Sequence, residues 1–204
     1  MKKVFFICIT FTVFIMPTTC FAGVDFILDL RPVSMLFSPD VDGFKVSRTS
    51  GSITESDTIR GSASYMPNLK AGLRINTSAL NIDLTGGIGF LYNDAFHSSM
   101  YLADLALRFK ISKHATIGPH VSVIKFDPTW DGSGSDSSDV KLSEETSMMP
   151  GLCFTVGGKT ASFSASIDYI DTSFDVTTRN GWVANDTSID MSGFAIQLGV
   201  LFSF

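Results

Sequence analysis

The chain has 204 residues, 45% of them hydrophobic, and its 20 Asp and Glu against 15 Lys and Arg give a formal net charge of −5 at pH 7. This length suffices for one domain. The excess of acidic residues excludes nucleic acid as a partner, because binding to a phosphate backbone requires a basic surface.

The first 22 residues have the layout of a secretory signal peptide. A pair of lysines precedes an apolar run over residues 4–16, and the segment ends at Ala22. The run is shorter than the ~20 residues that a helix needs to cross a bilayer, which disfavours a membrane anchor. Cys20 raises the alternative of a lipoprotein, but the residues before it do not fit that processing. Cleavage after Ala22 is the prediction.

The expected mature chain, residues 23–204, has a net charge of −7, because the two lysines of the signal leave 13 basic residues against 20 acidic ones. Cys153 is its only cysteine, so no intrachain disulfide is possible. No apolar run after residue 22 is long enough for a membrane-spanning helix. Any membrane span must therefore consist of strands in a closed barrel.

Eight segments carry the alternation of apolar and polar residues that marks a strand with two different faces. In the third segment, for example, Ile82 and Leu84 lie on either side of Asp83. The fifth and sixth segments are less regular, since Pro119 and Pro150 each remove a hydrogen-bond donor from the ladder. The segments are 24–36, 64–75, 80–92, 100–111, 115–126, 146–156, 160–171 and 189–204.

The connections between these segments alternate between long and short. The short ones have typical turn residues and cover 76–79, 112–114 and 157–159. The long ones cover 37–63, 93–99, 127–145 and 172–188. This alternation is typical of barrels with short periplasmic turns and long external loops. We therefore predict an all-β fold with one domain over residues 23–204, an eight-stranded antiparallel up-and-down transmembrane β-barrel.

Alternation alone does not say whether the apolar face points to lipid or, as in a lipocalin, into a soluble barrel. Equal numbers of acids and bases on the polar parity favour an enclosed lumen, because buried charges are tolerated only when they are partnered. The predicted lumen charge network consists of Asp25, Asp29, Asp83, Asp104 and Asp168 with Arg31, Lys70, Arg74, Arg108 and Lys110.

The positions of the tyrosines also favour an apolar face that points to lipid. All four lie on the apolar parity near strand ends that this topology places outside: Tyr65, Tyr92, Tyr101 and Tyr169. Trp130 and Trp182 fall in or beside long connections. Aromatic side chains at one level are typical of the girdle at a membrane interface.

The last strand carries apolar residues on one parity up to the final residue, with small or polar residues and Leu201 on the other. This ending resembles the closing strand of bacterial outer-membrane barrels, which the barrel assembly machinery reads during biogenesis. The resemblance implies an assembly signal of Phe194, Leu198, Val200, Phe202 and Phe204.

The whole mature chain resembles the small eight-stranded outer-membrane proteins, such as the OmpA-type transmembrane domain and OmpX. The resemblance rests on the strand layout and the terminal motif. It implies a monomer in the outer membrane of a Gram-negative bacterium, surrounded by lipid and lipopolysaccharide. It leaves function open, because this scaffold carries adhesins, structural proteins, small pores and lipid-modifying enzymes.

Three functions stay open at this point. A paired lumen network predicts a plugged barrel with a structural or surface-interaction role through its external loops. Small residues on the polar parity could instead leave a narrow pore or small-solute channel: Gly87, Gly89, Ser162, Ser164, Ser166 and Gly199. Cys153 shares this parity and is predicted to fill the lumen. Lipid A modification is the third alternative.

The third alternative rests on His120 and Ser122, which lie two residues apart on one strand face, as a base and a nucleophile require. Val123 follows where some lipid A deacylases have Asn, and no acid is obviously placed to orient the histidine. We predict a lumen histidine rather than an enzyme, with no catalytic residue and no cofactor.

The segment from Asp131 to Asp139 has oxygen ligands at short spacing but departs from the EF-hand pattern. We predict a solvated, flexible acidic loop and no metal site. Acidic external loops of this kind could share divalent cations with lipopolysaccharide phosphates.

Overall fold

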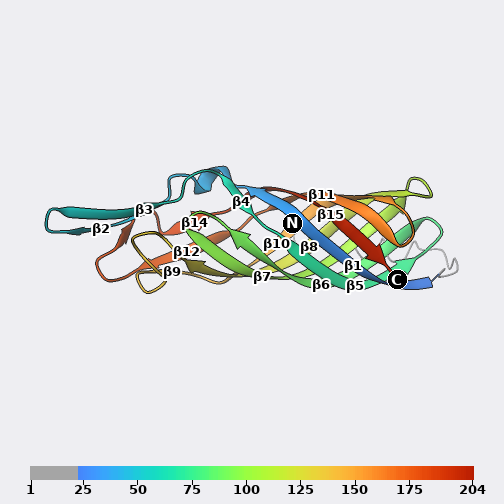
Figure 1. Cartoon of the computed structure of the whole chain (residues 1–204), viewed down its shortest axis with the longest axis horizontal. Helices are drawn as coiled ribbons and strands as arrows, with labels where there is room; N and C mark the ends of the chain where they lie inside the picture. The colour runs from blue at the N-terminus through green and yellow to red at the C-terminus, as the bar shows by residue number, and fades with distance from the viewer. Residues whose placement is uncertain (1–22) are drawn as a thin grey trace, which may run out of the picture.

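The computed structural model describes residues 23–204, so the predicted signal peptide lies outside the described residues. The first strand, β1 (Gly23–Phe37), pairs antiparallel with the last, β15 (Gly193–Ser203), and this pairing closes the barrel. The elongated barrel has the C-terminus at one end and the long connections at the other (Figure 1). Closure leaves the barrel without a free edge, as a lipid-spanning sheet requires.

Each barrel strand pairs antiparallel with its neighbours along the chain. The second barrel strand is divided into β4 and β5, with Pro67 between them, and the register of β1 shifts between Leu30 and Val33. The strands after β1 are β4 (Ala63–Tyr65) with β5 (Asn68–Asn76), β6 (Leu80–Tyr92), β7 (Phe96–Lys110), β8 (Ala115–Trp130), β10 (Glu145–Gly157) and β11 (Ala161–Ile170). The predicted eight-stranded antiparallel barrel is confirmed.

Some predicted strand boundaries were wrong. β7 begins at Phe96 rather than at residue 100, which reduces the expected connection 93–99 to residues 93–95. β8 runs on to Trp130, because its alternation of buried and exposed residues continues beyond residue 126. Pro119 and Pro150 lie within β8 and β10, so neither proline ends its strand.

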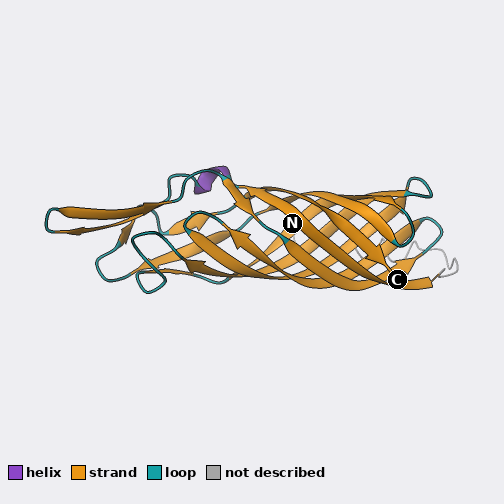
Figure 2. Ribbon diagram, in the orientation of Figure 1, coloured by secondary structure: helices purple, strands orange, loops and turns teal. Residues whose placement is uncertain are grey.

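The three longest connections are more ordered than expected. They contain a 3₁₀ turn and two three-stranded sheets, which extend well beyond the barrel (Figure 2). We call residues 38–62, 93–95, 131–144 and 171–192 the external cap. Its elements are η1 (Pro39–Val41), β2 (Lys45–Ser50), β3 (Ile53–Thr58), β9 (Val140–Leu142), β12 (Ser173–Thr178), β13 (Val183–Ala184) and β14 (Ser188–Asp190).

The apolar parity of the strands points outward. Leu84, Leu152 and Ile167 are each at least 60% exposed on the barrel surface, while charged residues of the other parity are buried inside. A water-soluble barrel has the opposite arrangement, so the lipocalin-like alternative is wrong. Among residues 23–204, no helix has the length and apolar character needed to cross a membrane.

Candidate functional site

The lumen is filled in two layers. From the middle of the barrel toward the short turns it contains buried charged and titratable side chains, which we call the ionic layer. They are Asp29, Arg31, Lys70, Arg74, Asp83, Asp104, Arg108, His120 and Asp168. All of them project from barrel strands on the inward parity.

Asp83 on β6 joins two arginines. Arg74, opposite Asp83 in the β5–β6 register, donates from Nε and Nη2 to the two carboxylate oxygens at 2.7 Å each. Arg108 on β7 donates from Nε to Asp83 Oδ2 at 2.6 Å. Paired charge-assisted hydrogen bonds of this kind are strong, and they offset the cost of burying the three charges.

Lys70 joins two further carboxylates. Its Nζ lies 3.7 Å from Asp29 Oδ2 and 3.4 Å from Asp104 Oδ1. Arg31 donates from Nε to Asp29 Oδ2 at 3.0 Å and from Nη1 to Ser166 Oγ at 2.6 Å. These contacts link β1, β5, β7 and β11 through the lumen.

His120 on β8 lies between two carboxylates. Its Nδ1 is 2.9 Å from Asp104 Oδ2 and its Nε2 is 2.5 Å from Asp168 Oδ1. The expectation that no acid is placed to orient this histidine was therefore wrong. Asp104 and Asp168 are 16 and 48 residues away in sequence, so only the barrel brings them together.

Gly151 allows His120 and Asp168 to meet. On β10 it lies opposite His120 of β8 and opposite Asp168 of β11. A Cβ atom at Gly151 would lie 1.9 Å from Asp168 Oδ1, so a larger residue would displace that carboxylate. The contact between the histidine and the acid thus passes over a glycine on the strand between them.

Two predicted network members lie at the rim. Asp25 is half-buried and accepts hydrogen bonds from Asn76 Nδ2 at 2.9 Å and Ser203 Oγ at 3.0 Å. Lys110 is exposed at the end of β7, and its Nζ donates to the carbonyl oxygen of Thr77. The structure therefore does not bring Lys110 into the ionic layer, because the strand ends where a turn carbonyl and water are within reach.

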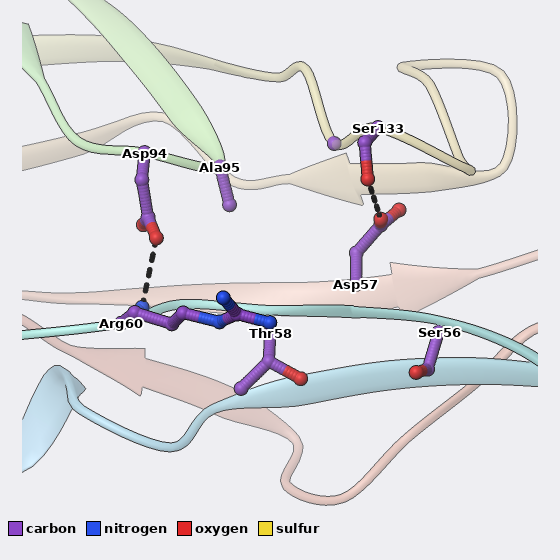
Figure 3. A pocket seen from close by; sticks show the side chains of 8 residues that line it. Ser56, Asp57, Thr58, Arg60, Asp94, Ala95 and Ser133 are labelled. Carbon is purple, nitrogen blue, oxygen red and sulfur yellow. Dashed lines mark hydrogen bonds between the residues drawn. The ribbon is translucent and has the colours of Figure 1, made fainter.

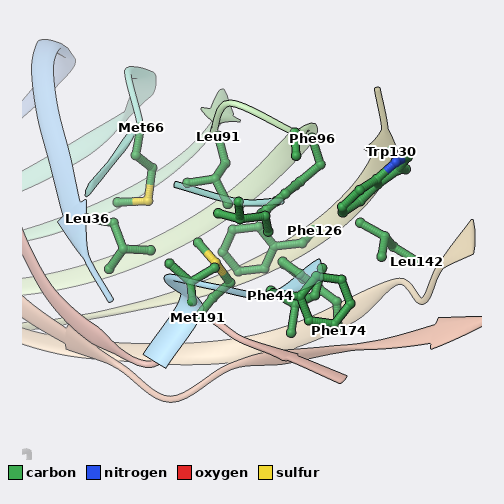
Figure 4. Packing of buried hydrophobic residues seen from close by; sticks show 14 of the residues in the cluster. Leu36, Phe44, Met66, Leu91, Phe96, Phe126, Trp130, Leu142, Phe174 and Met191 are labelled. Carbon is green, nitrogen blue, oxygen red and sulfur yellow. The ribbon is translucent and has the colours of Figure 1, made fainter. Parts of the chain in front are cut away.

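Toward the external cap, the lumen is apolar (Figure 4). Edge-to-face ring contacts join Phe126 to Phe174 and Phe44 to Trp130, with centroids 5.7 Å and 6.1 Å apart. We call this cluster the apolar layer, and it combines residues of β1, β6, β7, β8, β10, β11 and β15 with residues of the cap. It comprises Leu36, Val41, Phe44, Val46, Ile59, Met66, Leu91, Ala95, Phe96, Met100, Leu102, Ile124, Phe126, Trp130, Val140, Leu142, Met149, Ile170, Phe174, Trp182, Ile189, Met191 and Ala195.

The tryptophans belong to this layer and not to a membrane girdle. Trp130 and Trp182 are 1% and 3% exposed. Trp130 Nε1 donates to Ser135 Oγ at 2.9 Å, which satisfies its polar atom. Their place beside long connections in the sequence suggested an interfacial position, but the cap folds over them.

The small residues of the polar parity leave less open volume in the lumen than a pore requires. A Cβ atom at Gly87 would lie 2.2 Å from the carbonyl oxygen of Leu69, and one at Gly199 would lie 2.0 Å from that of Leu30. Neighbouring backbone thus occupies the space that a side chain would take. Ser164 donates to Asp29 and Ser166 to Asp168, and Cys153 is buried and donates to the Gly118 carbonyl.

The predicted girdle and assembly residues lie on the outer surface. The four tyrosines are 42–56% exposed: Tyr65, Tyr92, Tyr101 and Tyr169. In the last strand, Phe194, Leu198, Val200 and Phe204 are exposed and Phe202 is half-buried. Phe204 and Phe26 exchange backbone hydrogen bonds of 2.9 Å and 3.2 Å, which extends the closing pair to the final residue.

The cap contains a buried acid, Asp57, that the sequence analysis missed. It accepts a hydrogen bond from Ser133 Oγ (Figure 3). It also accepts hydrogen bonds from the amides of Gly134 and Ser135 and from Ser135 Oγ. Partial burial favours the neutral acid, but the hydrogen bonds from Ser135, Ser133 and Gly134 outweigh it and lower the pKa of Asp57 below its usual value.

The expected flexible loop from Asp131 to Asp139 is therefore partly wrong, since its middle is folded around Asp57. Asp131 and Asp136 are exposed, as predicted, whereas Asp139 is half-buried and accepts a hydrogen bond from Asn180 Nδ2 at 3.0 Å. A polar cleft of about 290 Å³ lies beside it, and its lining includes Asp57, Arg60, Asp94 and Ser133 (Figure 3). Within residues 23–204 no group of three or more His, Cys, Asp or Glu could hold a metal ion.

Taken together, a closed barrel with a lipid-facing apolar surface, short turns at one end and long connections at the other defines the class of protein. The chain is a small eight-stranded integral membrane β-barrel.

Comparison with solved structures agrees with this class. The outer membrane protein OprG from Pseudomonas aeruginosa superposes with a TM-score of 0.54 at 11% identity, covering 91% of this chain and 98% of that one. Neisserial surface protein A superposes with a TM-score of 0.53 at 15% identity, covering 89% of this chain and 99% of that one. At these identities the likeness concerns the fold. The chain matches no protein-family profile and no curated protein sequence.

Proposed function

We propose that the barrel is a closed membrane support that displays the external cap at the cell surface, in a structural or surface-interaction role. The observation that carries this proposal is the filled lumen. The apolar layer disfavours the passage of ions and water, and the ionic layer below it pairs its charges internally. Eight strands enclose an interior that side chains can just fill.

The charge of the cap supports the second half of the proposal. The residues of the external cap include thirteen Asp and Glu against five Lys and Arg, a formal charge of −8. The remaining part of residues 23–204 has seven acids against eight bases. We propose lipopolysaccharide as the first partner of this acidic surface, with divalent cations shared between carboxylates and phosphates.

A narrow pore is the rival function, and conductance in a planar bilayer separates the two. We expect the refolded chain, inserted and shown by gel mobility to be folded, to give no discrete openings. Reproducible single-channel steps would contradict the closed barrel. In that case charge reversal at Arg108 and Asp83 should change the ion selectivity, because these side chains lie in the lumen.

Lipid A modification is disfavoured by the geometry. Ser122 Oγ donates to Asp104 Oδ2 at 2.7 Å, and both nitrogens of His120 face carboxylates. A nucleophilic serine needs its hydroxyl hydrogen-bonded to the base. Both side chains are also buried in the lumen, away from the lipid surface where the substrate lies.

A further inference from the structure

We propose that Asp104, His120 and Asp168 form a proton-binding site in the lumen, in which the imidazole carries both of its protons at neutral and mildly alkaline pH. The bound proton holds β7, β8 and β11 together. The proposal rests on the closed lumen proposed above, and it adds a ligand, the proton, on which closure depends.

The first argument is the hydrogen-bond inventory of imidazole. A neutral ring has one N–H group and one nitrogen lone pair. Each ring nitrogen of His120 lies within hydrogen-bond distance of a carboxylate oxygen, at 2.9 Å and 2.5 Å. With a neutral ring and two ionised acids, one nitrogen lone pair would face an oxygen lone pair at that distance. One additional proton is therefore required within the cluster.

The second argument places this proton on the ring. Asp104 also accepts from Ser122 Oγ at 2.7 Å and lies 3.4 Å from Lys70 Nζ. Asp168 Oδ2 accepts from Ser166 Oγ at 2.8 Å and from Gln197 Nε2 at 2.7 Å. All four oxygens of the two acids thus face donors, which is the acceptor-only arrangement of a carboxylate. The imidazole is then the group that holds the proton.

The third argument is the charge balance of the lumen. The ionic layer has four aspartates and four Lys or Arg residues, and half-buried Asp25 adds a fifth acid at the rim. Because Lys110 lies outside the lumen, a charged His120 supplies the fifth positive charge. The sequence predicted five acids and five bases in the lumen, and these numbers then hold with His120 in place of Lys110.

Closure should therefore depend on pH. A free imidazole loses its second proton near pH ~6.5, whereas the folded cluster keeps it, so folding binds a proton and stability falls as the pH rises through its release. The titratable groups in contact with His120 are Asp104 on β7 and Asp168 on β11. Lys70 on β5 contacts Asp104, and Cys153 on β10 is two residues from Gly151, the register partner of His120. The side chains presented by β15 and by β8 itself, Gln197 and Ser122, do not titrate in this range.

The direct test is ¹⁵N NMR of the histidine ring nitrogens in the folded barrel in micelles. The chain between residues 23 and 204 has three histidines, and His120→Asn assigns the signals of the site. At pH 8 we expect both ring nitrogens of His120 to carry a proton. A neutral His120 ring at pH 8 would overturn the proposal. This NMR readout does not depend on conductance. A conducting barrel would therefore contradict the proposed function, while the protonation of His120 could still be tested.

A pair of isosteric variants tests the consequence. Asp168→Asn can place its amide NH₂ where Oδ1 faces His120 and keep a carbonyl where Oδ2 accepts from Ser166 and Gln197. It reproduces the charge of the protonated cluster with a neutral ring. Asp104→Asn cannot, because one oxygen faces the His120 and Ser122 donors and the other faces Lys70.

In a Cys153→Ser background, which removes the thiol titration, the unfolding temperature is measured at pH 7 and pH 10. The parent chain should lose about 5 °C or more over this range. Asp168→Asn should match the parent at pH 7 and lose much less at pH 10, whereas Asp104→Asn should be less stable at both. Equal losses in the parent and Asp168→Asn would contradict the proposal. If Asp168→Asn does not fold, the NMR result on the parent chain decides.

Discussion

At the scale of single residues, position along the barrel axis decides what an inward-facing charge does. Lys110 and Arg108 share the inward parity of β7, yet Arg108 is buried against Asp83 and Lys110 is exposed at the rim. Two residues of a strand are only about 6–7 Å apart along it, which is enough to move a side chain from the lumen to the aqueous edge. Parity thus predicts the direction of a side chain but not its surroundings.

The ionic layer predicts a large loss of stability when one acid is removed. Asp104→Ala leaves Lys70, Ser122 and His120 without their shared carboxylate, and we expect it to lower the free energy of unfolding by about 3–5 kcal/mol. Urea unfolding in micelles and heat resistance in gels measure the effect. Asp127→Ala, at an exposed outward position of β8, is the control. If Asp104→Ala keeps full heat resistance, the network has no structural role.

At the scale of elements, the cap is held to the barrel by contacts between separate connections. Asp57 of β3 accepts its hydrogen bonds from the connection after β8, 76–78 residues further along the chain. Phe174 of β12 packs on Phe126 of β8. The small sheets of the cap are therefore anchored at points where buried side chains meet, and the cap is continuous with the packed lumen.

The lowered pKa of Asp57 predicts a pH dependence of the cap. A carboxylate with a depressed pKa stabilises the native state above its unfolded value, near ~3.9, and this contribution is lost as the pH falls through the native pKa. Asp57→Ala should therefore lower the protection factors of the Gly134 and Ser135 amides against hydrogen exchange by about tenfold or more, and acidification below pH ~4 should lower the same protection factors in the parent chain. Asp175→Ala, at an exposed position of β12, should leave both amides protected.

At the scale of the whole molecule, polarity is distributed along one axis. The outer surface of the barrel is apolar, the lumen changes from ionic to apolar toward the outside, and the cap beyond it is acidic. An acidic surface directly above a bilayer of phosphorylated lipids repels those phosphates unless cations lie between them. The charge distribution therefore makes divalent cations part of the proposed interaction.

This distribution predicts a cation-dependent stabilisation by lipopolysaccharide. In phosphatidylcholine vesicles that contain lipopolysaccharide and Mg²⁺ we expect the unfolding temperature to be about 5 °C higher than without lipopolysaccharide, and EDTA should remove the difference. Neutralising exposed cap acids as Asp131→Asn, Asp175→Asn and Asp186→Asn should reduce it. Lys113→Gln with Lys159→Gln, at the short turns, is the matched control. A difference that persists in EDTA would contradict cation bridging.

The strand alternation was enough to predict the barrel and its closure by the last strand. Of the ten charges assigned to the lumen, eight are buried in it, while Asp25 and Lys110 lie at the rim. The alternation did not predict the apolar layer. Residues such as Phe44 and Phe174 lie in connections whose overall composition is polar, and short strands of two to six residues leave little periodicity to detect.

The sequence by itself determined the architecture. A strand with lipid on one face and a narrow lumen on the other requires a period of two, and this period is visible in the residues of each strand alone. Only the tertiary structure decided which charges meet. His120, Asp104 and Asp168 come from three strands, and Gly151 on a fourth leaves the gap in which they touch. Such contacts depend on the register between strands and on the curvature of the closed barrel, and neither is written in the residues of one strand.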